Sequence, residues 1–345
     1  MFKRFKPLDH SIIGIDITPL SIKVVEISKT SDHFVVDNIN SEPLPANALV
    51  DNQIKDQDAI TACVKKLIHG TSLRGKTAAV LAIPNSAIIT KVIQVSSKVP
   101  EREMEESVFL EASKYFSYPI NEINLDFIIQ GPSDTHAHQL DVLVIACRAE
   151  NINGRVEAIS RAGLVVKVVE MESNSLERII PWLCHSTLNQ TQRIAVINVN
   201  RFSATLHVID TGKTSFTHEE IFAANPWVKR FEQDHETLDS AFIHNKIQHE
   251  LDKISLSSDL ILRHLKRMLQ FFSSTTAHRL DHIFLAGEIF DLPHLAQCLQ
   301  ETIRTPTTVA NPFRRMKFSI PPCPTKMAKA ASFILACGLA LRDVD

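Results

Sequence analysis

Runs of β-branched residues and stretches with apolar residues at helical spacing alternate along the chain. Near the N-terminus, three runs at 12–17, 21–27 and 33–44 are rich in Val and Ile and are separated by Pro, Asp and Asn. Such runs are typical of strands. The next segment, 58–69, has a helical apolar pattern, and Gly70 stands where a helix C-cap is expected. The opening is therefore predicted to be a three-stranded meander followed by a helix.

A smaller group of strands and one helix follows. Pro100 stands just ahead of the helical pattern, and acidic residues crowd its first turn, where they complement the helix dipole. The predicted elements are strands at 77–84, 87–95, 124–132 and 140–148 and a helix at 101–116. A helix at 151–162, ended by Gly163, and a strand at 165–170 come next. This order predicts a small α/β module that interrupts the first domain.

The strand pattern of the opening recurs in the second half of the chain. Strands are predicted at 193–200, 203–210 and 213–222, with a turn at Gly212. The repeated order of strand, strand, turn and strand indicates a duplicated architecture. The remaining predicted elements are a helical segment around Trp182, a long helix at 238–272, a strand at 282–287, a helix near Leu295 and a C-terminal apolar helix at 330–341.

Composition is that of a folded protein with no large charged surface. The 345 residues are 44% hydrophobic and 22% charged, enough chain for two domains of about 150 residues. Lys plus Arg number 37 against 39 Asp plus Glu, which argues against nucleic acid as a partner. The six cysteines are scattered without a CxxC pair, as expected of reduced thiols.

Targeting, membrane and metal signals are weak throughout the sequence. The basic N-terminus leads into only a short apolar run before Asp16, so no secretory signal is predicted. The apolar stretch at 330–341 is shorter than the roughly 20 residues of a membrane span, and a buried helix is expected there. Among the 15 histidines no set of four ligands is apparent. We therefore expect a cytoplasmic protein without a transmembrane span or a metal cluster.

The segment 14–23, GIDITPLSIK, is the strongest candidate for chemistry. It places a carboxylate, Asp16, at the end of a hydrophobic strand and hydroxyls at Thr18 and Ser21 in the following turn. Backbone N–H groups of such a turn can bind a phosphate, and the carboxylate can order the waters around Mg²⁺. A plain hairpin with an Asp near its tip fits the same residues, and both interpretations stay open on this segment alone.

Several longer segments resemble the PilM family of type IV pilus assembly proteins. They are GIDITPLSIKVVEI, TKVIQV, EREMEESVFLEASKYFSYPINEINLDF, LQFFSS, DHIFLAG, TTVANPF and ACGLALR. That family resembles the cell-division actin homologue FtsA and belongs to the superfamily of actin, hexokinase and heat-shock ATPases. The resemblance implies an α/β, actin-like fold, in which a ribonuclease H-like domain is duplicated and an α/β subdomain is inserted.

The resemblance also implies domain limits and partners. The first actin-like domain is expected over 1–180, with the inserted partner-binding subdomain at about 80–148, and the second over 181–345. ATP with Mg²⁺ is expected between the duplicated halves. The inserted subdomain is expected to help form a groove for the cytoplasmic N-terminal peptide of PilN, a single-span inner-membrane protein. The chain would then link the inner-membrane platform to the pilus motors from the cytoplasmic face of that membrane, and self-association is left open.

The resemblance assigns roles to particular residues. The first phosphate loop comprises Gly14, Asp16, Thr18 and Lys23, with Asp16 also serving the metal. The second phosphate loop contains Asn198 and Asn200, the adenosine element contains Gly287 and Glu288, and Glu172 stands near the position that orients an attacking water. Glu170 is a second carboxylate of the same connecting segment. Two solvated acids after a strand are the alternative interpretation of Glu170 and Glu172.

Five positions depart from the family pattern in ways that bear on the nucleotide. Asn198 replaces a carboxylate that helps hold hydrated Mg²⁺, and Asn200 adds a side chain where the backbone approaches phosphate. Glu288 replaces the second glycine of the adenosine element, and Ala223 and Ala224 replace a further glycine pair. These changes weaken hydrolysis more than the fold, because left-handed geometry is tolerated by Asn and the core pattern is untouched.

An adaptor with a degenerate ATP site is therefore the leading functional hypothesis, with at most weak ATPase activity. An active ATPase of the superfamily is one alternative, which would need intact phosphate loops. A membrane-tethered filament protein like FtsA is another. That role uses a basic amphipathic C-terminal helix, whereas this sequence ends in ACGLALRDVD.

Overall fold

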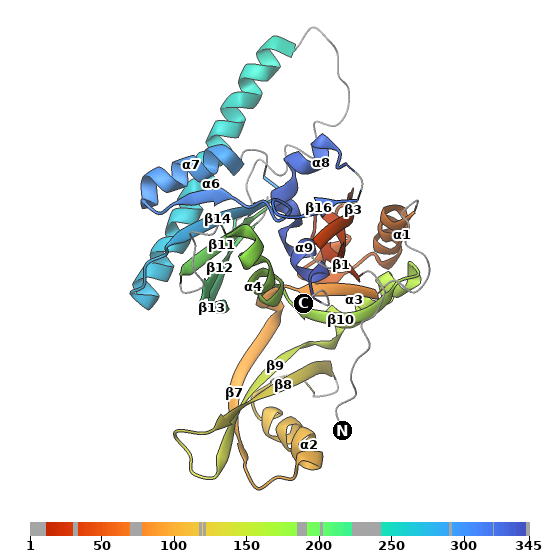
Figure 1. Cartoon of the computed structure of the whole chain (residues 1–345), viewed down its shortest axis with the longest axis vertical. Coiled ribbons are helices and arrows are strands. Elements are labelled where there is room, and N and C mark those ends of the chain that lie inside the picture. The colour runs from red at the N-terminus through yellow and green to blue at the C-terminus, as the bar shows by residue number, and fades with distance from the viewer. Residues whose placement is uncertain are drawn as a thin grey trace. The chain divides into compact units, whose positions relative to one another are not determined.

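Two compact units divide the chain in the computed structural model (Figure 1). The first comprises 1–28, 38–172 and 339–345, and the second comprises 29–37 and 173–338. The predicted boundary between residues 180 and 181 thus lies eight residues beyond the observed change at 172/173. The structure describes residues 12–29, 34–69, 78–116, 119, 122–184, 192–200, 203–222, 243–289, 292–319 and 321–342.

The first unit is organised by a mixed sheet in the order β10-β6-β1-β2-β3. Strand β1 pairs antiparallel with β2 and parallel with β6, which in turn is parallel to β10. The strands are β1 (Ile12–Ile17), β2 (Ser21–Lys29), β3 (Phe34–Pro43), β6 (Ala78–Ile83) and β10 (Val165–Met171). The start of β3 belongs to the second unit, where β16 (Lys317–Phe318) pairs with it. The predicted opening meander is confirmed.

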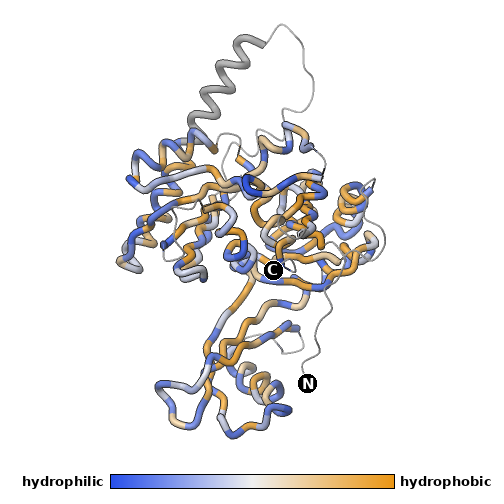
Figure 2. The backbone as a smooth tube through the Cα atoms, viewed as in Figure 1, coloured by the Kyte–Doolittle hydropathy of each residue, from blue (hydrophilic) through white to orange (hydrophobic). Residues whose placement is uncertain are grey.

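Two helices and a short hairpin complete the core of the first unit. Helix α1 (Gln57–Ile68) begins at Asp56, whose carboxylate accepts from the Ala59 N–H at 2.8 Å. Its apolar face and that of α3 (Ala149–Arg161) bury against the sheet. The hairpin of β4 (Leu49–Val50) and β5 (Gln53–Ile54) packs beside them. Figure 2 shows hydrophobic residues concentrated along the strands that these elements cover.

The inserted module follows β6 and forms its own antiparallel sheet, β7-β9-β8. Its elements are η1 (Asn85–Ala87), β7 (Ile88–Ser96), α2 (Glu101–Ala112), β8 (Ile123–Pro132) and β9 (Gln139–Arg148). The predicted start near residue 80 falls inside β6, so the insertion begins a few residues later. Helix α2 is shorter than predicted because the chain tightens at once into a turn, in which the Tyr115 N–H donates to the Ala112 carbonyl.

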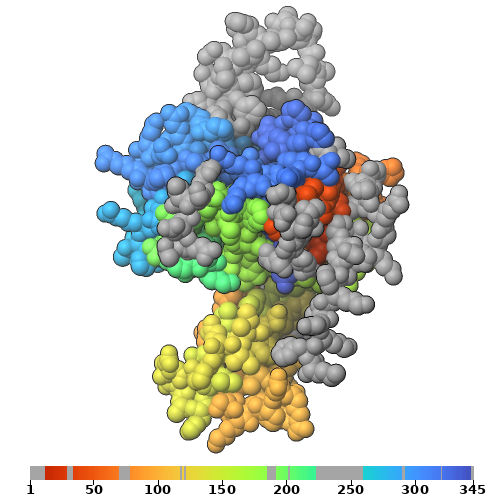
Figure 3. Space-filling view, in the orientation of Figure 1, coloured from red at the N-terminus to blue at the C-terminus, as the bar shows by residue number. Residues whose placement is uncertain are grey.

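One face of the module's sheet is covered and the other is open. Helix α2 contributes Met104 and Val108 to a small core with alternate residues of β7 and β9. The opposite face carries the cross-strand row Val92, Leu143 and Ile128, and Ile128 is 57% exposed. The space-filling view shows the surfaces of β8 and β9 in yellow beside α2 in orange (Figure 3). The alternation of the strands therefore produces two chemically different faces.

The second unit repeats the sheet of the first, in the order β13-β12-β11-β14-β15. Strand β12 is antiparallel to both β13 and β11, β14 is parallel to β11, and β15 is parallel to β14. The strands are β11 (Arg193–Val199), β12 (Ser203–Asp210), β13 (Lys213–Ile221), β14 (His282–Gly287) and β15 (Thr307–Val309). The predicted duplication is confirmed by this shared order.

Helices α4 (Glu172–Leu183), α6 (Ile243–Thr276) and α7 (Leu292–Ile303) accompany this second sheet. The long helix was predicted over 238–272, and residues 238–242 lie outside the described part. Within the predicted C-terminal helix, 330–341, a 3₁₀ turn η4 (Ala330–Phe333) precedes α9 (Ile334–Ala340), and a separate short helix α8 (Pro324–Ala328) comes before them. All residues of 330–341 except Ser332 are buried, as expected. No helix in the described residues is long and apolar enough to cross a bilayer.

Candidate functional site

The turn between β1 and β2 holds the first predicted phosphate loop. Asp16 and Lys23 lie directly opposite each other in the strand register, and Lys23 Nζ is 3.6 Å from Asp16 Oδ2. Both side chains are almost fully buried. A buried pair of opposite charges at the end of a central strand is costly unless each charge is compensated. The structure thus keeps one carboxylate and one ammonium together where the phosphate and its metal are expected.

Hydrogen bonds within the turn involve several of its polar groups. The Thr18 N–H donates to the Ser21 carbonyl at 3.0 Å, and the Ser21 N–H donates to Thr18 Oγ1 at 3.1 Å. Pro19 has no N–H to offer. The turn as folded therefore presents fewer backbone donors to a phosphate than its sequence suggests.

The corresponding turn of the second unit is closed in the same way. The Asn200 N–H donates to the Ser203 carbonyl at 2.9 Å, and the Ser203 N–H donates to Asn200 Oδ1 at 2.9 Å. Asn200 thus takes the place of Thr18, and its side-chain oxygen accepts the hydrogen bond that closes the turn. Asn198 lies half-buried two residues earlier, paired in register with Ala286. No carboxylate replaces it at that strand position.

Gly287 ends β14 beside Val199, the last residue of β11. Its φ is +117°, and a Cβ at this position would lie 1.9 Å from the Val199 carbonyl oxygen. The following residue, Glu288, donates its N–H to that same oxygen at 3.0 Å. Only glycine fits such an approach. The residues Asn198, Asn200, Gly287 and Glu288 therefore gather at one edge of the second sheet, whereas Ala223 and Ala224 lie outside the described residues.

The two acids of the connecting segment differ in their surroundings. Glu170 is buried and forms an ion pair with Arg342, so the alternative interpretation of a solvated acid does not hold for this residue. Burial makes the carboxylate depend on its basic partner. Glu172 is half-buried at the first position of α4, and its proposed role in orienting water stays a prediction. Across the described residues, no cluster of three or more His, Cys, Asp or Glu is arranged to hold a metal ion.

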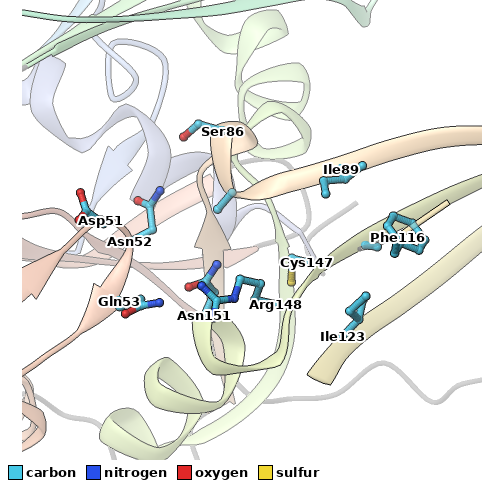
Figure 4. Close-up of a pocket in the computed structure, with 12 residues that line it drawn as sticks. Asp51, Asn52, Gln53, Ser86, Ile89, Phe116, Ile123, Cys147, Arg148 and Asn151 are labelled. Atoms are coloured by element: carbon cyan, nitrogen blue, oxygen red, sulfur yellow. The ribbon is translucent and has the colours of Figure 1, made fainter. Parts of the chain in front are cut away.

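A cavity of about 250 Å³ lies between the inserted module and the β4–β5 hairpin of the first unit. Figure 4 shows Asp51, Asn52 and Gln53 on one side and Ile89, Phe116 and Ile123 on the other, with Arg148 and Asn151 between them. Ser86, Ala87, Ala146 and Cys147 complete the lining. One wall is thus apolar and the other is polar. An extended segment with both kinds of side chain would match this cavity.

The backbone conformation of the hairpin and the contacts of Glu150 hold the polar wall in place. Asp51 and Asn52 both have positive φ, 49° and 65°, as a two-residue type I′ hairpin requires. Arg148 forms an ion pair with Glu150 at 2.7 Å, and Gln53 donates to the same carboxylate at 2.5 Å. Sequence reasoning missed this hairpin, although an Asp-Asn pair between short apolar runs is a recognised turn signal.

Two sheets of the same strand order, each with a matching closed turn after its first strand, define a duplicated, actin-like protein. The family described as type IV pilus assembly protein PilM matches residues 14–344. The chain belongs to this PilM family.

Solved structures share the fold. A PilM-PilN type IV pilus biogenesis complex is similar with a TM-score of 0.74 and 24% identity, covering 99% of this chain and 100% of that chain. The ethanolamine utilization protein EutJ from Carboxydothermus hydrogenoformans is similar with a TM-score of 0.53 and 11% identity, covering 97% and 91%. The predicted actin-like fold and PilM resemblance are confirmed.

Proposed function

We propose that this chain is a cytoplasmic adaptor of type IV pilus assembly, which holds the N-terminal peptide of a PilN-type inner-membrane protein in the cavity beside the inserted module. Family membership supports the process, and the similar structure is named as a complex with PilN. The single observation that carries the proposal is the two-sided cavity. Bound there, the peptide would tether the chain at the inner face of the membrane and connect it with other platform and motor proteins.

The walls suit a short, extended and mixed-polarity segment. Ile89, Phe116 and Ile123 offer an apolar surface, and Ile89 is 52% exposed as the structure stands. The hairpin and Asn151 offer amide and carboxylate groups on the opposite wall. Pockets with an apolar body and a few placed polar groups bind ligands in a defined orientation. Covering Ile89 with an apolar peptide side chain would remove exposed hydrophobic surface from water.

The test is calorimetric titration of the full chain with a synthetic peptide of the cognate PilN N-terminus. We expect Ile89→Asp to abolish binding, because it places a charge on the apolar wall. Ile128→Asp is the matched control, since Ile128 is similarly exposed at 57% but lies on the opposite face of the same sheet. Equal loss in both variants, or no binding by the parent chain, would rule out the proposed groove.

ATP with Mg²⁺ is proposed as a ligand, with hydrolysis absent or slow. Asp16 and Lys23 fit a hydrated cation and a phosphate, because Mg²⁺ usually takes one or two protein carboxylates and keeps several waters. The nucleotide would supply the phosphate charge, and Lys23 would orient toward it. Asn198 stands where the family has a carboxylate that helps hold hydrated Mg²⁺, which is why hydrolysis is expected to be slow. Glu172 is the residue proposed to orient an attacking water.

Nucleotide titration tests the proposed binding of ATP, and phosphate release tests whether ATP is hydrolysed. Calorimetry with Mg-ATP should give binding that Asp16→Asn weakens, while phosphate release stays below about one turnover per second, the low end of typical enzymes. Turnover at ordinary enzyme rates that Glu172→Gln removes would instead favour an active ATPase. Binding unaffected by Asp16→Asn would overturn the role given to this carboxylate.

A further inference from the structure

Arg155 is a buried arginine on α3 that no predicted site included. It is only 1% exposed, and its Nη1 donates to two backbone carbonyls, that of Asn52 at 2.7 Å and that of Asn151 at 2.8 Å. Asn52 belongs to the turn of the β4–β5 hairpin, and Asn151 lines the cavity. One guanidinium therefore joins the hairpin wall of the groove to the helix beneath it.

The other two nitrogens of the guanidinium group are buried without a hydrogen bond. Among the residues that the structure describes, neither Nε nor Nη2 of Arg155 has a hydrogen-bond partner. A buried charge that is only half bonded is costly, so something else must favour keeping arginine here. Burial lowers the pKa of Arg155, and the nearby negative charges of Glu172 and then Asp16 act in the opposite direction. Charge attraction from these two acids offsets part of the cost.

The topology of the fold places Arg155 near Glu172 and Asp16. Helix α3 leads through the Gly163 turn into β10, so the helix runs back along that strand. Its first half consequently lies near the end of β10, where Glu172 follows. Strands β1, β6 and β10 are parallel, and their carboxyl ends therefore share one edge of the sheet. Asp16 is at the same end of β1, so the groove and the phosphate turn flank a common edge.

We propose that Arg155 is a positioning residue that holds the hairpin wall of the groove in place under the attraction of Asp16 and Glu172, so that charge arriving at Asp16 changes peptide affinity. The proposal rests on the proposed peptide-binding function and deepens it. Neutralising Asp16, by a bound cation or by substitution, removes part of the attraction. The guanidinium then holds the Asn52 carbonyl less firmly, and the groove loses its preformed wall.

Calorimetry of the full chain with the synthetic PilN peptide tests this link. We expect Arg155→Met to weaken peptide binding at least about tenfold, which is about 1.4 kcal/mol. Arg161→Met is the matched control on the same helix, since Arg161 forms an exposed pair with Asp58, and its affinity should stay within about twofold of the parent. Arg155→Lys should fall between them, because lysine keeps the charge but loses the fork of donors.

The Asp16→Asn variant tests the link between the two sites more directly. Asp16→Asn should weaken the peptide about fivefold, at the lower end of ordinary coupling between sites. In the double variant with Arg155→Met this loss should disappear, because the connecting residue is gone. A folded Arg155→Met chain with parent affinity would overturn the proposal, and so would an Asp16→Asn loss that simply adds to the Arg155→Met loss.

Amide hydrogen exchange keeps the proposal testable if Arg155→Met does not fold. Exchange in the hairpin, residues 49–54, should be faster in Asp16→Asn than in the parent, while α1 is unchanged. Unchanged exchange in the hairpin would overturn the link. If the parent chain binds no peptide, the adaptor function fails, and the exchange result still decides whether Asp16 acts on the hairpin.

Discussion

Replacing Gly287 by Ala should destabilise the second unit far more than replacing Gly212. Both glycines have positive φ, +117° and +80°, so an added Cβ strains either position by about 1–2 kcal/mol. At Gly212 nothing lies within 4 Å of that Cβ, whereas at Gly287 the Val199 carbonyl oxygen is 1.9 Å away. The contact must open, and the hydrogen bond from the Glu288 N–H to that oxygen is lost with it.

The expected losses follow from these terms. Gly212→Ala should cost about 1–2 kcal/mol from backbone strain alone. Gly287→Ala adds at least about 1 kcal/mol for the broken hydrogen bond, besides the separation of β11 from β14, and should lose about 3 kcal/mol or more. A domain is stable by only about 5–15 kcal/mol, so the difference is easily measured.

Urea unfolding followed by tryptophan fluorescence measures both variants in the same transition. Trp182 belongs to the second unit and reports on its unfolding. The midpoint should fall much further for Gly287→Ala than for Gly212→Ala. Equal midpoints would refute the close approach as the reason for glycine at position 287.

Two further outcomes follow from buried groups and a third from a helix cap. Burial lowers the pKa of His207 to about 4, below the ordinary value that the side chain regains on unfolding. The free energy of unfolding should therefore be at its full value above about pH 6.5 and fall by about 3 kcal/mol toward pH 4. Urea unfolding at several pH values measures this loss. Arg342→Met should cost about 3 kcal/mol in thermal unfolding, because the buried Glu170 carboxylate loses its basic partner. Asp56→Ala should cost about 1 kcal/mol by removing the N-cap bond to Ala59, again measured by urea unfolding.

Strands and helices could be predicted from the hydrophobic pattern because burial against a neighbour imposes a periodic pattern on each element. Strand β11, with buried residues along nearly its whole length between two neighbours, was predicted within one residue. Helix α2 was placed correctly at its start, where Pro100 and acidic residues mark the first turn, but its end was not. Helix ends depend on local turn bonds, such as that of Tyr115, which leave little pattern in sequence.

The C-terminal segment shows how tertiary contact overrides a simple pattern. Residues 330–341 read as one apolar helix, but a 3₁₀ turn precedes α9. Gly338 packs so closely on Ser175 that a Cβ would lie 2.3 Å from its carbonyl oxygen. A neighbour 163 positions away in the chain leaves no periodic signal, so this contact could not be predicted from sequence.

Some candidate site residues could be predicted from the sequence, and others became apparent only from the folded structure. The turn at Asp16 was found because a carboxylate after a buried strand is conspicuous. Arg155 was missed, although it lies four residues after Asn151 on the buried face of α3, where a charged residue is unusual. Its role depends on the Asn52 carbonyl, about 100 positions away, and that contact appears only once the chain is folded.

Photo-crosslinking tests the central claim, that a PilN-type peptide occupies the cavity of the first unit, most directly. A synthetic PilN N-terminal peptide with benzophenone at an apolar position would be irradiated with the full chain, and the adducts mapped by mass spectrometry. We predict adducts at Ile89, Phe116 or Ile123, lost on competition with unlabelled peptide. Specific adducts confined to the second unit, or on the open face around Ile128, would contradict the account.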